Sequence, residues 1–106
     1  MIKVISAKRF PKKPRKEISQ ILFENERTRI ETIISPRGFS NQKGFWYDQN
    51  EDEFVRVIRG EAELLFEGNQ FVKMIEGDSI YIPAHSKHRV ERTRYETEWL
   101  AVFYKK

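Results

Sequence analysis

The stretch GDSIYIPAHSKHRV, residues 77–90, contains both histidines of the chain, His85 and His88. It opens with a Gly-Asp turn, continues through a short apolar run to Pro83, and reaches a second run at His88 in which polar and apolar residues alternate. Glycine tolerates positive φ, and proline is confined to the edges and ends of strands. The stretch therefore predicts two short β-strands joined by a turn that carries a histidine.

The rest of the chain repeats this pattern of short apolar runs and polar turns. No stretch keeps an apolar face at helical spacing for three turns. Turn residues such as Glu67-Gly68-Asn69 separate the runs, and strands spaced at about 8 to 12 residues are typical of a sandwich or barrel. We expect an all-β fold with strands over residues 19–24, 28–35, 53–59, 61–67, 70–75, 79–83, 88–94 and 97–104.

Length and composition indicate one globular domain. A chain of 106 residues, of which 39% are hydrophobic, can bury one modest core. No apolar run approaches the roughly 18 residues of a membrane span, and the N-terminus lacks the apolar segment of a secretory signal. We therefore expect a cytoplasmic protein with no membrane association. Cysteine is absent, which excludes disulfides, thiolate metal sites and cysteine nucleophiles.

The net charge of +4 is unevenly distributed along the chain. Residues 1–17 contain seven Lys or Arg and one Glu, so this segment carries +6 and the remainder −2. We expect an exposed basic arm over residues 1–18 and a single domain over residues 19–106. A basic arm can contact phosphates, but no aromatic-rich platform or helix-turn-helix pattern accompanies it, so nucleic acid is not the expected partner.

Alternation within the strands predicts which side chains point inward, because successive residues face opposite sides of a sheet. In EFVRVIR, residues 53–59, Val55 lies on the same face as Glu53, and we place this face inside. In the strand that begins at His88, the same count puts His88, Val90 and Arg92 together, facing inward. The predicted interior therefore holds a carboxylate and an imidazole.

These residues resemble the cupins, a family of small jelly-roll barrels with a double-stranded β-helix fold. The second cupin motif has Gly, Pro and His at the spacing of Gly77, Pro83 and His88, and the first ends with Glu and Gly at the spacing of Glu53 and Gly60. The resemblance covers about residues 40–104. It implies a cupin barrel, a small-molecule ligand and a homodimer.

The metal ligands of the family are only partly present. The two histidine positions of the first motif are occupied by Tyr47 and Gln49, or by Trp46 and Asp48 if the gap before the glutamate is one residue longer. A mixed oxygen and nitrogen set would suit Fe, Mn, Zn or Ni about equally. The ligands of a divalent metal that the resemblance implies are Gln49, Asp48, Glu53 and His88.

Three further residues are candidates for ligand binding: Tyr47, Arg92 and His85. His85 stands where the family has glycine, and a surface position in the turn is favoured over one at the mouth of the barrel. Arg92 stands where the family has an amide. An inward-facing cation requires a carboxylate, supplied either by the protein or by an anionic ligand.

Two functions follow from the resemblance. In the first, a bound metal and the candidate catalytic residues Glu53 and His88 act on a small polar or anionic molecule, as in dioxygenase-like or isomerase-like cupins. In the second, the barrel binds or senses a small ligand without turnover and its metal site is degenerate. Glu53 and His88 could also form a buried hydrogen-bonded pair that needs no metal.

Overall fold

Eight antiparallel β-strands form the described part of the chain, which in this computed structural model comprises residues 2–6 and 10–106. The strands are β1 (Ile18–Glu24), β2 (Thr28–Ser35), β3 (Asp52–Arg59), β4 (Glu61–Phe66), β5 (Gln70–Ile75), β6 (Ser79–Ile82), β7 (His88–Thr93) and β8 (Thr97–Tyr104). Each strand end lies within one residue of the position predicted from alternation, so the all-β prediction is confirmed. No helix among the described residues is long and apolar enough to cross a membrane.

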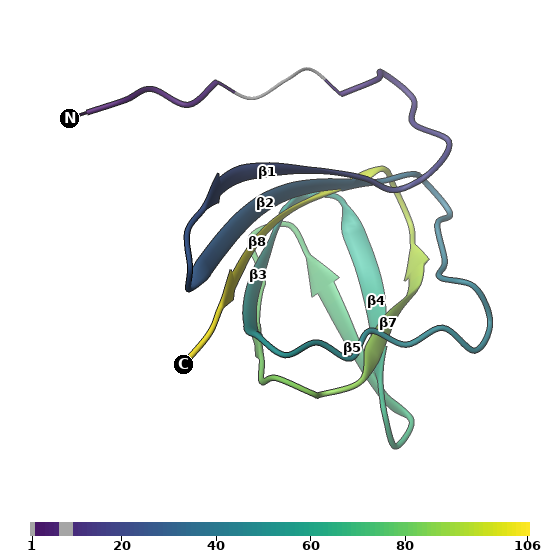
Figure 1. Ribbon diagram of the computed structural model, residues 1–106. Helices are drawn as coiled ribbons and strands as arrows, with labels where there is room; N and C mark the ends of the chain where they lie inside the picture. Colours follow the sequence, from purple (N-terminus) through teal and green to yellow (C-terminus); the bar gives the residue numbers. More distant parts are fainter. Residues whose placement is uncertain (1, 7–9) are drawn as a thin grey trace.

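The strands form two sheets that face each other and enclose the interior of a barrel (Figure 1). The five-stranded sheet has the order β1-β2-β8-β3-β6, and the three-stranded sheet has the order β5-β4-β7. The long loop between β2 and β3 returns along the second sheet, where Tyr47 forms an isolated bridge with His88. This bridge brings the residues that precede β3 to the start of β7.

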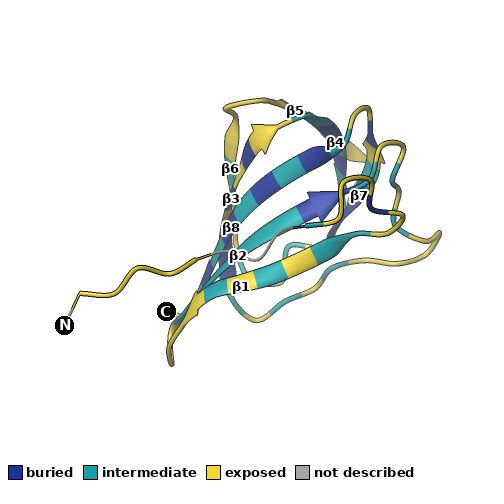
Figure 2. Cartoon of the chain, turned by 90° about the horizontal axis from the view of Figure 1, so that it is seen from above, coloured by how far each residue is buried: buried dark blue, intermediate teal, exposed yellow. Residues whose placement is uncertain are grey.

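The core fills the space between the sheets, as the alternation predicts. On β3, Val55 and Val57 are buried, whereas Phe54 and Ile58 are exposed on the outer face. Figure 2 shows buried and intermediate residues alternating along β8, the strand beside β2. The buried hydrophobic cluster consists of Val55, Val57, Ala62, Leu64, Met74, Ile82, Val90, Trp99, Ala101 and Phe103.

A bulge in β7 corrects the predicted orientation of Arg92. The pairing of β7 with β4 shifts by one residue between Val90 and Arg92, so Glu91 is an extra residue in the ladder. A bulge moves the following side chains to the opposite face. Arg92 is consequently exposed, and Thr93, at 1% exposure, takes the inward position. The prediction that Arg92 shares the inner face with His88 is wrong for this reason.

The N-terminal segment is exposed over residues 2–6 and 11–13. Two basic residues of the predicted arm, Lys8 and Arg9, lie outside the described residues. Closer to β1, Pro14 is buried and Glu17 lines the barrel interior. The last residues before β1 therefore pack against the barrel, while the boundary predicted at residue 18 between arm and domain stays a prediction.

Candidate ligand-binding site

A cavity of about 340 Å³ lies inside the barrel and is lined by residues of both sheets. One wall is apolar and is formed by Val55, Leu64, Ile82, Val90, Trp99 and Phe103. The polar lining includes Glu17, Arg29, Glu31, Tyr47, Gln49, Glu53 and His88. A small site with apolar walls and a few convergent polar groups is typical of a small-molecule binding pocket.

Glu53 and His88 meet at the centre of this polar lining. Glu53 belongs to β3 in one sheet and His88 begins β7 in the other, and Glu53 Oε1 lies 3.6 Å from His88 Nε2. The two residues are only 7% and 5% exposed, respectively. The structure thus brings together the carboxylate and the imidazole chosen from the sequence, and their chemical roles stay a prediction.

The orientation of the His88 ring is fixed by its neighbours. Its Nδ1 lies 2.8 Å from the carbonyl oxygen of Ser86, and because a carbonyl only accepts, Nδ1 carries a proton and donates it. The ring lies between the rings of Tyr47 and Phe66, at centroid distances of 5.4 and 5.6 Å. Nε2 is therefore directed at Glu53. When His88 is neutral and Glu53 is ionised, Nε2 and Oε1 are both acceptors, so a proton or another cationic group is needed between them.

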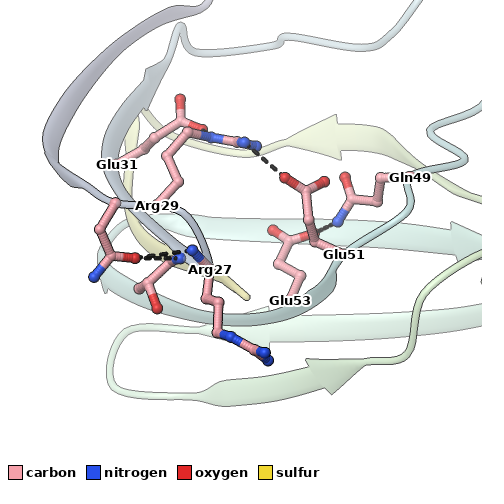
Figure 3. Close-up of polar contacts among 8 residues, drawn as sticks. Arg27, Arg29, Glu31, Gln49, Glu51 and Glu53 are labelled. Carbon is pink, nitrogen blue, oxygen red and sulfur yellow. Dashed lines mark hydrogen bonds and ion pairs between the residues drawn. The ribbon is translucent and has the colours of Figure 1, made fainter. Parts of the chain in front are cut away.

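Gln49 supports the carboxylate of Glu53. Its Nε2 donates a hydrogen bond of 3.0 Å to Glu53 Oε1 (Figure 3). Gln49 thus lies beside the carboxylate, as the spacing predicted, but it presents its amide nitrogen there. In the same view the carboxylate of Glu51, two residues before Glu53, accepts a hydrogen bond from Arg29.

Glu17 is a cavity residue that the sequence reasoning missed. Ser35 Oγ donates to its Oε2 at 2.8 Å, and the Tyr47 hydroxyl donates to its Oε1 at 3.2 Å. Burial raises the pKa of the Glu17 carboxyl, and the charges of Glu31 and Glu53 add to that increase. The available signal was a single glutamate at the end of a basic segment, immediately before the first strand.

Tyr47 links Glu17 to His88. Its hydroxyl contacts Glu17 and its ring stacks on His88, so both ends of the side chain are engaged in the cavity. Burial, together with the nearby charge of Glu17, raises the pKa of Tyr47 to about 12. The phenol therefore stays protonated at neutral pH and acts as a hydrogen-bond donor.

The charge of the cavity is predominantly negative. Within the part of the chain that the structure describes, three carboxylates line it, from Glu17, Glu31 and Glu53, against one guanidinium, that of Arg29. Arg29 is already paired, with its Nε 2.8 Å from Glu31 and its NH1 2.7 Å from Glu51. Its cation is thus balanced within the protein, and the remaining carboxylates favour ligands that donate hydrogen bonds or carry positive charge.

The structure does not bring His85 and Asp48 to the cavity. They contact each other, with His85 Nδ1 2.8 Å from Asp48 Oδ1, and their side chains are 62% and 42% exposed. His85 has a φ of 63°, the left-handed conformation that a glycine at this turn adopts without strain. Because Tyr47 and Gln49 point into the cavity, Asp48 between them points away from it. This corrects the expectation that Asp48 lies with Glu53 and His88.

The donor set does not match the metal site that the resemblance implies. Glu53 and His88 offer two strong ligands, and Gln49 adds only an amide. Among the described residues there is no group of three His, Cys, Asp or Glu side chains placed to hold a metal ion. A catalytic zinc site normally uses three protein ligands and a structural site four. The chain's own residues therefore do not complete such a site.

Comparison with known proteins assigns the fold. Residues 35–103 match the sequence model of the Cupin domain family. A structure from Ralstonia eutropha JMP134, named as a proposed mannose-6-phosphate isomerase, is 41% identical, with 92% of this chain and 94% of that chain covered and a TM-score of 0.82. No curated protein is similar enough to match.

More distant structures share the fold. A cupin superfamily protein from Desulfitobacterium hafniense DCB-2 is 18% identical, with 100% of this chain and 99% of that chain covered and a TM-score of 0.80. An RmlC-like cupin with a double-stranded β-helix fold from Methanocaldococcus jannaschii is 21% identical, with 99% and 92% covered and a TM-score of 0.77. The matched residues and the barrel agree, and the chain belongs to the cupin family.

Proposed function

We propose that the chain binds a small polar molecule in the barrel cavity and that Glu53 and His88 contact it and exchange protons with it. The observation that carries this proposal is the 3.6 Å approach of Glu53 Oε1 and His88 Nε2 inside a cavity of about 340 Å³. Both groups are held in place before a ligand arrives, by Gln49 and by the Ser86 carbonyl. Preorganised acid and base groups contribute typically about 10²- to 10⁴-fold to a reaction rate.

The reaction class that suits this pair is an isomerisation by proton transfer. In the interconversion of an aldose and a ketose, one proton moves between adjacent carbons and one between their oxygens, so no atoms or electrons are gained or lost. Glu53 would remove the carbon-bound proton, and His88 would exchange the oxygen-bound one. The name of the 41% identical Ralstonia protein, as a proposed mannose-6-phosphate isomerase, supports this choice of class.

The charge of the cavity argues against a phosphorylated ligand there. A phosphate group would lie among Glu17, Glu31 and Glu53. Arg29, the only guanidinium among the described lining residues, is paired with two carboxylates. Like charges in a partly dry cavity disfavour binding. The proposed ligand is therefore neutral and hydroxylated, or carries an amine.

A divalent metal ion is the second candidate for the space between Glu53 and His88. The observation in its favour is the hydrogen bond of His88 Nδ1 to a backbone carbonyl, which is the usual arrangement of a metal-bound histidine. Glu53, His88 and a reoriented Gln49 would be the protein ligands, and Fe, Mn, Zn or Ni would each suit them. Two firm ligands predict weak binding that does not survive purification.

The test uses three probes of matched shape: mannose, mannosamine and mannose 6-phosphate. Calorimetry measures binding to the wild type and to the variants Glu53→Gln and His88→Asn, with His85→Asn as the matched control outside the cavity. We expect mannose or mannosamine to bind, each cavity variant to lose about tenfold in affinity, or about 1.4 kcal/mol, and the control to change by less than about twofold. Proton NMR then detects any ketose formed from a bound sugar.

Several outcomes contradict the proposal. Equal losses in the His85 control and the His88 variant would place the ligand elsewhere. Binding without any ketose would favour the non-catalytic alternative, in which the barrel only holds or senses its ligand. Saturable binding of about one equivalent of added Mn or Zn to the untagged chain, lost in both cavity variants, would replace the metal-free proposal by the second candidate.

A further inference from the structure

A second cavity, of about 430 Å³, lies beside the three-stranded sheet and is separate from the barrel interior. It is lined by residues of β4, β5, the end of β7 and the loop that follows β2. None of the Glu53–His88 site residues contributes to it. Its charged lining residues are Arg37, Glu61, Glu63, Lys73, Arg92 and Arg94.

Positive charge exceeds negative charge in this second cavity. Four cationic side chains face two carboxylates, and Glu61 Oε2 lies 3.7 Å from both Lys73 Nζ and Arg94 NH1. One carboxylate thus serves two cations at long range. The guanidinium groups of Arg37 and Arg92 form no ion pair or hydrogen bond with any part of the chain that the structure describes. Two arginines are therefore available to an external anion.

The local fold places these two arginines along the same cavity. The bulge at Glu91 turns Arg92 out of the barrel, to a position opposite Glu63 of β4. Thr93 fastens the loop to the end of β7: its hydroxyl donates to the Pro36 carbonyl at 2.6 Å and its carbonyl accepts from the Gly38 amide at 3.0 Å. These bonds flank Arg37 on both sides and hold its backbone beside β7.

We propose that this second cavity binds a phosphate group, either inorganic phosphate or the phosphate of a small monoester. The excess of two positive charges matches the charge of a phosphate dianion, and guanidinium groups offer it paired, coplanar donors. Arg92, a ligand-binding candidate in the sequence, would thus bind its anion outside the barrel. The proposal does not depend on the chemistry of Glu53 and His88.

The test is a titration of ¹⁵N-labelled full-length protein with inorganic phosphate and with glucose 6-phosphate, at constant ionic strength, with glucose as the uncharged probe. We expect saturable shifts centred on the amides of Gly38, Thr93 and Arg94 for both phosphates and none for glucose. The double variant R37Q/R92Q should lose at least about tenfold in affinity. The phosphate affinity of R37K/R92K should lie between those of the wild type and R37Q/R92Q, because lysine keeps the charge but not the paired donors.

The matched control is Arg56→Gln. Arg56 is exposed on β3 and, in the described structure, forms no ion pair, so its removal lowers the net charge without touching the second cavity. We expect this variant to change phosphate affinity by less than about twofold after screening by salt. Shifts that do not saturate, or an equal loss in the Arg56 variant, would overturn the proposal, as would tighter binding of a single-stranded oligonucleotide through the same amides.

Discussion

The carboxyl group of Glu17 is held inside the barrel by donors from Ser35 and Tyr47. Ser35 is itself oriented by Trp99, whose Nε1 donates to the Ser35 oxygen at 3.0 Å in the buried core. Burial raises the pKa of Glu17 above its ordinary value of 4.5, and nearby carboxylates raise it further. The folded protein therefore holds a proton on Glu17 at a pH where the unfolded chain has released it.

This shift predicts how Glu17 affects stability as pH rises. Between 4.5 and the higher folded-state pKa, the native state binds more protons than the unfolded state, so the Glu17 contribution falls with increasing pH and stays low above that window. Glu17→Gln removes the titration. We expect the free energy of unfolding of the variant, relative to wild type, to increase from pH 4 to pH 8 in urea melts.

Glu76→Gln is the matched control for this prediction, because Glu76 is exposed and forms no ion pair within the described structure. Its difference from wild type should not follow the same trend with pH. A Glu17 variant whose stability relative to wild type falls between pH 4 and pH 8 would show that the ionised carboxylate stabilises the fold. The pKa of Glu17 would then be lowered by folding and not raised.

Site residues were predictable where two independent signals agreed. Alternation along β3 and β7 and the motif spacing both selected Glu53 and His88, and the structure brings them together. Glu17 had neither signal, because it follows a run of basic residues and its partners Ser35 and Tyr47 are distant in the chain. A contact made only by tertiary folding leaves no local pattern.

At the scale of single elements, the turn at Gly60 leaves the least space for a side chain among the described glycine turns. It connects β3 to β4 with a φ of 100°, and a Cβ at this position would lie 2.7 Å from Thr97 Cα and 2.8 Å from the Glu96 carbonyl oxygen. Both neighbours are backbone atoms of the segment that leads into β8, so they cannot rotate away. The glycine is required by space as well as by conformation.

Gly60→Ala should therefore destabilise the fold more than Gly68→Ala. Gly68 has a similar φ of 89°, but a Cβ there would meet no atom within 4 Å. We expect Gly68→Ala to lower the free energy of unfolding by about 1 to 2 kcal/mol, from the conformation of the backbone alone. Gly60→Ala should cost at least about 2 kcal/mol more because of the backbone clash. Chemical denaturation measures both values, and equal losses would mean that the β8 backbone moves aside at little cost.

The elements themselves were predictable because short apolar runs are separated by polar turn residues along the chain, and alternation then gave the inner faces of β3, β4 and β7. Alternation failed at one position, the bulge at Glu91, because counting by twos assumes an unbroken ladder with β4. Neither a glycine nor a proline marks this bulge in the sequence HRVERT. Because of this one extra residue, Arg92 lines the second cavity and not the barrel cavity for which it was predicted.

At the scale of the whole molecule, the two cavities differ in position and in charge. The barrel cavity draws Glu53 from one sheet and His88 from the other, so it exists only in the closed fold. Its lining is acidic, whereas the second cavity beside the three-stranded sheet is basic. By charge alone, an amine or an uncharged sugar would thus be favoured in the barrel cavity, and a phosphate group would be favoured in the second cavity.

We propose that the predicted homodimer forms through the outer face of the five-stranded sheet. Phe54 on β3 is 43% exposed and lies opposite Tyr81 of β6, itself 47% exposed, and opposite Val102 of β8. Aromatic and aliphatic side chains on one sheet face are enriched where subunits meet. A two-fold contact would place this face of one copy against the same face of another.

Phe54→Glu should convert a dimer to a monomer, because two copies of the new carboxylate would be buried close together across the two-fold axis. Light scattering after size exclusion measures the mass of each species. The control is Phe71→Glu, at 55% exposure on β5 of the other sheet, which should leave the dimer intact. A monomeric wild type would refute the predicted homodimer, and dissociation by the Phe71 variant alone would move the interface to the three-stranded sheet, where it would compete with the second cavity for the same surface.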